Sequence, residues 1–204
     1  MQYNYLNDVE LVERAQAGDE YSFDELFHRY DAKICTYLVR QVGEDGRDLA
    51  QDTFLRAWQK IHTLQKEKNF EAWLYRIAGN LAKDYLRRKS LLQWLPWKEH
   101  NEGSRESPFS RNGPEGDYID QDFLKFASTR IPFNYWQCVI LQIVEERSQR
   151  EIAQLLGINE TSVSTYVKRG MQKLRQLYHD EELIRQKNTG AARTARTKGR
   201  KSAS

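Results

Sequence analysis

Residues that break helices are concentrated in one stretch of this chain, and this clustering constrains the fold more than any other feature. Three of the four prolines and three glycines fall within residues 95–117, amid polar side chains. On either side, apolar residues recur at helical spacing and no convincing strand alternation appears. Apolar residues are 39% of the 204, which suits two small cores better than one large core. The sequence therefore predicts an all-α fold of two small helical domains joined by a flexible linker.

Capping and stop residues set the expected boundaries. Asn7 is suited to begin a helix, and Gly18 and Gly43 are suited to end two of them. Before the linker, helices are expected near 8–17, 20–42, 46–61 and 70–92; after it, near 119–130, 133–145, 149–156 and 160–179. The corresponding division is a first domain over 1–92, a linker over 93–118, a second domain over 119–184 and a tail over 185–204.

The net charge of +3 is divided unevenly along the chain. No acidic residue follows Glu182, whereas the end of the chain holds seven cations: Arg185, Lys187, Arg193, Arg196, Lys198, Arg200 and Lys201. Without these seven, 25 basic residues face 29 acidic ones, so the body carries −4 and the tail +7. A nucleic-acid surface on the body must then be a local patch. From Gln186 onward there is no large apolar residue, which predicts a disordered basic tail.

Several functional classes find no support in the residues. No stretch approaches the roughly 18 unbroken apolar residues of a membrane span, and the N-terminus lacks the basic start and apolar run of a secretion signal. Cys35 and Cys138 show no partner spacing and form no ligand pattern with the four histidines. Neither a Walker loop nor a catalytic constellation is found. We expect a cytoplasmic protein without enzymatic activity, metal, cofactor or membrane insertion.

The segment SQREIAQLLGINETSVSTYVKRGMQKLRQLY, residues 148–178, predicts a helix-turn-helix. Ser148 followed by Glu151 is a capping box that opens a short helix, and Gly157 stands where a left-handed residue must end it. Asn159 can then cap the next helix. The spacing of cap, glycine and second cap is typical of the motif.

One face of the second helix of this motif is polar and the other is apolar. At about 100° per residue, the polar face carries hydroxyls and cations near the helix start: Thr161, Thr165, Lys168, Arg169 and Gln172. Hydroxyls and Arg suit base edges in a major groove, and Lys suits phosphates. The alternative is an ordinary solvated face, which the mutual agreement of the cap, the glycine, Ala153 and Val163 in their spacing disfavours.

The helix expected over FEAWLYRIAGNLAKDYLRRK carries a basic stripe beside its core stripe. Arg76, Asn80, Lys83 and Arg87 are spaced 4, 3 and 4 apart and lie on one side. Three cations with one amide between them suit a phosphate backbone and a base edge, and Trp73 at the margin could support a stacked base. A solvated flank with Trp73 wholly in the core is an equally good interpretation of this segment alone.

The preceding helix has the opposite electrostatic character. In RDLAQDTFLRAWQK, one face holds Asp48, Gln51, Asp52 and Leu55. DNA would be repelled by these carboxylates, so a partner at this face should be a basic protein. Taken alone, the pattern also fits a solvated surface.

Together these segments resemble the extracytoplasmic-function group of bacterial RNA polymerase sigma factors. DLAQDTFLRAW is similar to the core-binding motif of the family, and FEAWLYRIAGNLAKDYLRRK is similar to the segment that melts and reads the minus-10 element. The helix-turn-helix takes the place of the motif that reads the minus-35 element. All three occur in family order, and the resemblance covers residues 8–92 and 119–179.

The resemblance implies a role for each surface. It makes 1–92 a region 2-like domain and 119–184 a region 4-like domain, with Asp48, Gln51, Asp52 and Leu55 on the clamp coiled coil of core RNA polymerase. It makes Asn80, with the loop from His62 to Asn69, the receptor for a base flipped from the minus-10 strand, and it puts Arg76, Lys83 and Arg87 on its backbone. The recognition helix is poorer in Arg than is usual in the family, so minus-35 contacts would rely more on Thr161, Ser162 and Thr165. Gly170 in that helix costs about 1 kcal/mol of helix propensity relative to Ala.

Three points stay open at this stage. A self-sufficient helix-turn-helix regulator is the alternative function; it would need a symmetric pair of half-sites and has no use for the acidic face. The residues do not decide whether an anti-sigma factor binds the chain. Trp94 and Trp97 either pack back on the first domain or follow a linker that, in the family, threads toward the active-site channel.

Overall fold

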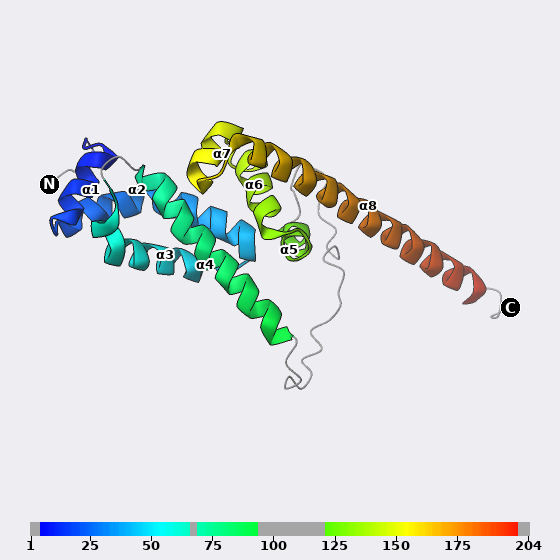
Figure 1. The fold of residues 1–204 in the computed structure, drawn as a ribbon. Helices are drawn as coiled ribbons and strands as arrows, with labels where there is room; N and C mark the ends of the chain where they lie inside the picture. Colours follow the sequence, from blue (N-terminus) through cyan, green and yellow to red (C-terminus); the bar gives the residue numbers. More distant parts are fainter. Residues whose placement is uncertain (1–4, 66–68, 94–120, 200–204) are drawn as a thin grey trace.

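The computed structural model describes residues 5–65, 69–93 and 121–199 (Figure 1). These ranges contain helices and no strand, so the predicted all-α class is confirmed for the described part. The predicted boundaries agree within two residues, the last helix excepted. The elements are α1 Asp8–Gln16, α2 Glu20–Val42, α3 Gly46–Lys60, a 3₁₀ turn η1 Ile61–Thr63, α4 Phe70–Gln93, α5 Gln121–Arg130, α6 Phe133–Ile143, α7 Gln149–Leu156 and α8 Glu160–Gly199.

Local hydrogen bonds explain where the first two helices begin and end. The Asn7 side chain accepts a hydrogen bond from the Glu10 backbone N–H at 3.0 Å, and the Glu10 carboxylate accepts one from the Asn7 N–H at 2.9 Å. This is a complete capping box. Gly43 ends α2 with a φ of 86°, a conformation open to glycine at little cost. The predicted start at Asn7 and stop at Gly43 are both confirmed.

Helices α1 to α4 enclose the larger core. Its fully buried members include Leu11, Leu26 and Ile34 of α1 and α2, and Leu74 and Leu81 of α4. Helix α3 approaches α2 closely at Gly46, where an added Cβ would lie 2.4 Å from the Val39 backbone nitrogen. Only a residue without a side chain fits this crossing, so Gly46 sets the distance between α2 and the start of α3.

Helices α5, α6 and α8 enclose a second, smaller core. Its centre is Trp136, which is fully buried, and its other buried members are Leu124, Ala127, Ile131, Val139 and Ile140. Helix α8 crosses α6 at Gly170, where an added Cβ would lie 2.6 Å from Val139 Cγ2. The glycine therefore permits a close approach of the two helices.

The two halves of the chain pack against each other. Helix α7 lies on α4, and α5 and α6 lie on α2 (Figure 1). The larger core continues across this junction, because Cys138, Leu141, Ile152 and Val163 belong to the same buried cluster as the residues of α2 and α4. The sequence predicted two separate cores and did not predict this continuity. The linker from 94 onward, with Trp94 and Trp97, lies outside the described residues, and the division into two domains stays a prediction.

Helix α8 extends much further than predicted. The sequence predicted a helix to residue 179 and disorder from 185, whereas α8 continues to Gly199 and its C-terminal part projects away from the other helices (Figure 1). The disordered tail was therefore wrong for residues 185–199. Ala, Gln, Lys and Arg favour helix, and a helix already nucleated by packing propagates without a new nucleation cost.

Neither cysteine is paired. Cys138 is buried and Cys35 is partly buried. Burial raises the pKa of the Cys138 thiol to about 12, so this thiol is not ionised at neutral pH. Within the described ranges, no three His, Cys, Asp or Glu side chains gather where they could hold a metal ion. None of the helices in those ranges has the length and apolarity needed to cross a bilayer.

Candidate functional site

The acidic face of α3 is exposed, as the sequence predicted. Helix α3 packs against α2 and α4 through buried residues such as Leu49 and Phe54. The opposite face presents the four predicted residues to solvent: Asp48, Gln51, Asp52 and Leu55. The Leu55 side chain is 57% exposed, although it is apolar. Two carboxylates, an amide and an exposed leucine on one helical face form a surface suited to a basic protein with an apolar contact point.

The basic stripe of α4 is divided into two parts. Asn80, Lys83 and Arg87 are exposed, and Arg87 pairs with Asp84 at 3.3 Å on the same helix. Arg76 is only partly exposed because α7 lies beside it: a Cβ at Gly157 would be 3.9 Å from the Arg76 guanidinium. The predicted stripe therefore has three accessible members and one member at the junction between the halves.

The sequence left open whether Trp73 is wholly in the core or is available to stack on a base, and the structure shows an intermediate position. Its ring is partly exposed, packs against the larger core and is 6.0 Å from the Phe70 ring. The Trp73 ring is therefore not wholly buried in the core, and it is not fully exposed to solvent.

The loop between η1 and α4 is anchored by a side chain that sequence reasoning missed. Gln16, the last residue of α1, donates hydrogen bonds to the carbonyl oxygens of Ile61 at 2.9 Å and Leu64 at 2.7 Å. At the other end of the loop, Asn69 accepts a hydrogen bond from the Ala72 N–H at 3.1 Å and so begins α4. The described ends of the loop are thus fixed by α1 and by α4.

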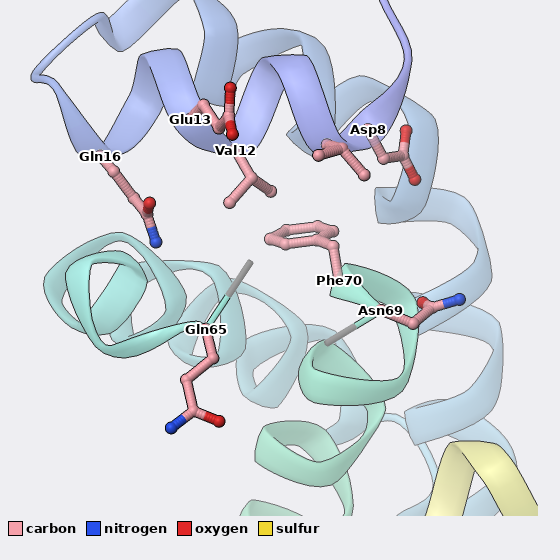
Figure 2. Close-up of a pocket in the computed structure, with 8 residues that line it drawn as sticks. Asp8, Val12, Glu13, Gln16, Gln65, Asn69 and Phe70 are labelled. Atoms are coloured by element: carbon pink, nitrogen blue, oxygen red, sulfur yellow. The ribbon is translucent and has the colours of Figure 1, made fainter. Parts of the chain in front are cut away.

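A small pocket lies beside this loop (Figure 2). Its volume is about 110 Å³, and it opens between α1 and the start of α4, where the Phe70 ring faces Val12. Its polar lining comes from Asp8, Glu13, Gln16, Gln65 and Asn69. Asn80 does not line it, so the structure does not bring Asn80 and the described loop residues together in this pocket.

The helix-turn-helix has the predicted caps. The Ser148 hydroxyl accepts a hydrogen bond from the Glu151 N–H at 3.3 Å, while the Glu151 carboxylate accepts one from the Ser148 N–H at 2.8 Å. The Ser148 hydroxyl also donates to the Glu151 carboxylate at 2.6 Å, and this bond, followed by the one from the Ser148 N–H, holds the pKa of Glu151 below its ordinary value. Gly157 ends α7 in the left-handed conformation, with φ 67° and ψ 38°.

The recognition helix presents its predicted polar face to solvent. Thr161, Thr165, Lys168 and Arg169 are exposed, and Ser162 is partly exposed. Arg169 donates a hydrogen bond to the Tyr135 hydroxyl on α6 at 3.2 Å, and the Tyr135 ring lies 5.3 Å from that of Tyr166. Tyr135 therefore holds one end of the Arg169 side chain. Sequence reasoning missed this contact because the two residues are 34 positions apart.

Family models match both halves of the chain. A model of Sigma-70 region 2 matches residues 26–91, and a model of Sigma-70, region 4, matches residues 130–174. The first match contains α3 and α4 up to residue 91, and the second contains α7 and α8 up to residue 174.

Similar curated proteins are named ECF RNA polymerase sigma factors. ECF RNA polymerase sigma factor BldN of Streptomyces coelicolor is 30% identical over 179 residues, which are 85% of this chain and 66% of the relative. ECF RNA polymerase sigma factor SigW of Bacillus subtilis is 29% identical over 178 residues, 83% of this chain and 95% of the relative. ECF RNA polymerase sigma-E factor of Haemophilus influenzae is 44% identical over 82 residues, 40% of this chain and 43% of the relative. The chain thus spans about two thirds of BldN and less than half of the sigma-E factor.

Solved structures share the fold. CnrH, in complex with the cytosolic domain of CnrY, superposes with a TM-score of 0.60 at 22% identity, covering 85% of this chain and 97% of that one. RpoE of Bartonella quintana, in complex with the anti-sigma factor NepR, superposes with a TM-score of 0.58 at 21% identity, covering 77% and 96%.

Proposed function

The chain belongs to the extracytoplasmic-function group of RNA polymerase sigma factors, and from this premise we propose that it binds core RNA polymerase and directs promoter recognition, strand opening and transcription initiation. One observation carries the proposal: Sigma-70 regions 2 and 4 match in that order, and the first match contains the acidic face of α3 and the stripe of α4, while the second contains the polar face of α8. Binding energy, rather than chemistry by this chain, would drive strand opening, so no catalytic step is assigned to it. We propose that the chain acts in the cytoplasm, where it would meet core RNA polymerase and promoter DNA.

The exposed face of α3 is the proposed polymerase-binding surface. Asp48, Gln51 and Asp52 offer oxygen acceptors to a basic helix, and Leu55 offers an apolar contact that would be buried on docking. Charge-assisted hydrogen bonds to carboxylates are about twice as strong as neutral ones, so Asp48 and Asp52 would carry much of the specificity.

The stripe on α4 and the polar face of α8 are the proposed DNA surfaces. Asn80 would receive a base of the melted minus-10 strand, with Trp73 at its margin, while Arg76, Lys83 and Arg87 would contact the strand backbone. On α8, Thr161, Ser162, Thr165 and Arg169 would read minus-35 base edges, and Lys168 would contact phosphate. An anti-sigma factor is a further proposed partner, since the similar RpoE structure contains one.

A pull-down of core RNA polymerase followed by run-off transcription tests the proposal. We expect the chain to co-purify with core enzyme and to direct specific transcripts from genomic promoter fragments. Polymerase-independent binding to a symmetric pair of half-sites, without transcripts, would instead identify a self-sufficient helix-turn-helix regulator.

Mutations in the two proposed DNA surfaces should each impair the binding of a different DNA template. We expect Asn80→Ala in holoenzyme to impair binding of a pre-melted minus-10 strand, and Arg169→Ala to weaken minus-35 duplex binding by about 1–3 kcal/mol through loss of a bidentate base contact. Fluorescence anisotropy on the two templates measures both effects.

Matched controls distinguish the loss of these DNA contacts from the general effect of removing an exposed amide or guanidinium. Asn134→Ala removes an exposed amide from α6, and Arg175→Ala removes an exposed guanidinium from another face of α8. Each control should change binding by less than the test variant on the same template. Equal losses by Asn80→Ala and Arg169→Ala on one template would show that the assignment of the two surfaces is wrong.

The basic end of α8 is proposed to add phosphate contacts that read no bases. Truncation after Leu183 removes all seven terminal cations, so the slope of log affinity against log salt for holoenzyme on promoter DNA should become shallower, by about 0.9 for each phosphate that those cations neutralise. Promoter preference should not change. An unaltered slope would remove the DNA-binding role of this segment.

A further inference from the structure

Tyr135 of α6 contacts the recognition helix at three points. Its ring centroid lies 5.3 Å from that of Tyr166, and its hydroxyl accepts a hydrogen bond from Arg169 Nη1 at 3.2 Å. Its carbonyl oxygen would lie 3.1 Å from a Cβ added at Gly170. Residues 166, 169 and 170 are three and four positions apart or adjacent, so they lie on one face of α8. Tyr135 therefore contacts a full turn of the recognition helix, including one residue proposed to read bases.

The absence of a side chain at Gly170 permits this close contact. Helix α8 lies across α6 (Figure 1), and a Cβ at Gly170 would be 2.6 Å from Val139 Cγ2, one turn further along α6 than Tyr135. A side chain at this position would push α8 away from α6, and the Tyr135 hydroxyl would lose its reach to Arg169. The residue that follows Arg169 thus sets the distance at which Tyr135 and Arg169 meet.

Tyr135 is itself fixed by its surroundings. Its ring is partly buried against the second core, and the next residue, Trp136, is fully buried in that core. The Tyr135 backbone N–H donates to the Pro132 carbonyl oxygen at 2.9 Å at the start of α6. Arg169, in contrast, is exposed, and a long exposed side chain has many rotamers open to it. The position of the hydroxyl therefore determines where the guanidinium lies.

The contact orients the Arg169 guanidinium and leaves it able to bind DNA. A guanidinium has five N–H donors, and the bond to Tyr135 uses one of them. The acceptor is a hydroxyl and not a carboxylate, so it does not neutralise the positive charge. Guanine presents two acceptors, O6 and N7, which one arginine can bind together in the major groove. An arginine already held at one nitrogen loses less conformational entropy when it forms these bonds.

We propose that Tyr135 is a positioning residue for minus-35 recognition, which fixes Arg169 before DNA binds and so sets the base pair that this arginine reads. The inference rests on the proposed function, because it takes the polar face of α8 as the minus-35 surface. Without the Tyr135 hydroxyl, Arg169 could turn toward a neighbouring base or a phosphate, and a phosphate contact carries no sequence information. Loss of the hydroxyl should therefore reduce discrimination between bases more than affinity for DNA in general.

Tyr135→Phe tests the proposal because it removes the hydroxyl and keeps the ring against Tyr166. The probe is a promoter found by run-off transcription, with each minus-35 base pair randomised in turn, and sequencing of the DNA bound by holoenzyme gives the base preference at each position. Arg169→Ala identifies the position that the arginine reads. We expect Tyr135→Phe to flatten the preference at that same position and to weaken binding of the preferred duplex about three- to tenfold.

A double-mutant cycle distinguishes positioning from a structural role. In the Arg169→Ala background, Tyr135→Phe should have no further effect on affinity or base preference, since no guanidinium is left to position. Tyr178→Phe is the matched control: it removes a hydroxyl from an α8 ring that packs edge-on against Phe123, outside the polar face. This control should change neither quantity.

The position of the guanidinium can also be measured in the free chain, without polymerase or DNA. Nitrogen-15 NMR relaxation should show Arg169 Nε to be more ordered than Nε of Arg175, another exposed arginine on α8. Tyr135→Phe should raise the mobility of Arg169 Nε to that of Arg175, and Tyr178→Phe should not. This measurement does not depend on the function of the chain.

Three results would overturn the proposal and leave the proposed function standing. They are an Arg169 Nε as mobile as that of Arg175 in the wild-type chain, a preference flattened by Arg169→Ala but not by Tyr135→Phe, and a Tyr135→Phe loss that persists in the Arg169→Ala background. The last would indicate a direct DNA contact or a packing role for Tyr135. If Arg169→Ala changes the preference at no position, the proposed minus-35 role of Arg169 is wrong and the inference falls with it, even where NMR shows the guanidinium to be held.

Discussion

We expect the double variant Asp48→Arg with Gln51→Ala to lose co-elution with core RNA polymerase in size-exclusion chromatography. Both side chains are exposed on α3, so neither substitution creates a cavity or buries a charge. The new guanidinium would repel a basic partner where a carboxylate attracted it, and like-charge juxtaposition at an interface costs several kcal/mol. Circular dichroism and the urea midpoint should match those of the wild-type chain.

A charge-matched control tests whether the loss of co-elution is specific to the acidic face of α3. Asp24→Arg with Gln176→Ala makes the same chemical changes at exposed positions on α2 and α8, outside the acidic face of α3. This variant should co-elute as the wild-type chain does. Undiminished co-elution of the α3 variant would rule out the polymerase-binding role of its acidic face.

Gly46→Ala should destabilise the chain by about 3 kcal/mol, the upper end of the usual cost of overpacking. The added Cβ would lie 2.4 Å from the Val39 nitrogen and 2.6 Å from the Leu38 carbonyl oxygen. These are backbone atoms of α2, so no rotamer change can relieve the contact, and α2 and α3 must separate at the cost of core packing. Urea denaturation measures the effect as a lower midpoint with little change in slope.

Gly79→Ala is the matched control for this substitution. Its added Cβ would lie 3.4 Å from the Tyr37 hydroxyl and 3.8 Å from Gln137, which are ordinary contact distances. Because Gly79 lies inside α4, Ala should stabilise the helix by up to about 1 kcal/mol. Equal midpoints for the two variants would contradict the account of Gly46 as a packing requirement.

Local features of the fold were predictable because their causes are local. The N-cap at Asn7, the capping box at Ser148 and the left-handed Gly157 each depend on residues within a few positions, and all three were identified from the sequence. Periodicity likewise predicted which faces of α3 and α8 are exposed. For the same reason the polar sets proposed as binding surfaces could be named before their environment was known.

Features that depend on distant residues could not be predicted in this way. The Tyr75–Glu145 and Arg147–Glu71 contacts join residues 70 and 76 positions apart. Gly170 illustrates the same limit: its cost in helix propensity is evident from the sequence, but the reason for accepting that cost is the approach of Val139 from α6. The sequence-based stripe on α4 also gave no sign that α7 would lie against Arg76.

The continuity of α8 changes what the basic end of the chain can reach. A flexible segment of 20 residues would explore a volume around its attachment point with a mean span of about 25 Å. A helix of 40 residues is instead a rod about 60 Å long, with the residues proposed to read bases near its start and Arg193, Arg196 and Lys198 near its end. Inserting one residue at position 181 would advance everything beyond it by about 1.5 Å and rotate it by about 100° about the rod axis. If α8 enters a groove as proposed, the angle of entry would thus set where the C-terminal end of the helix lies relative to the DNA.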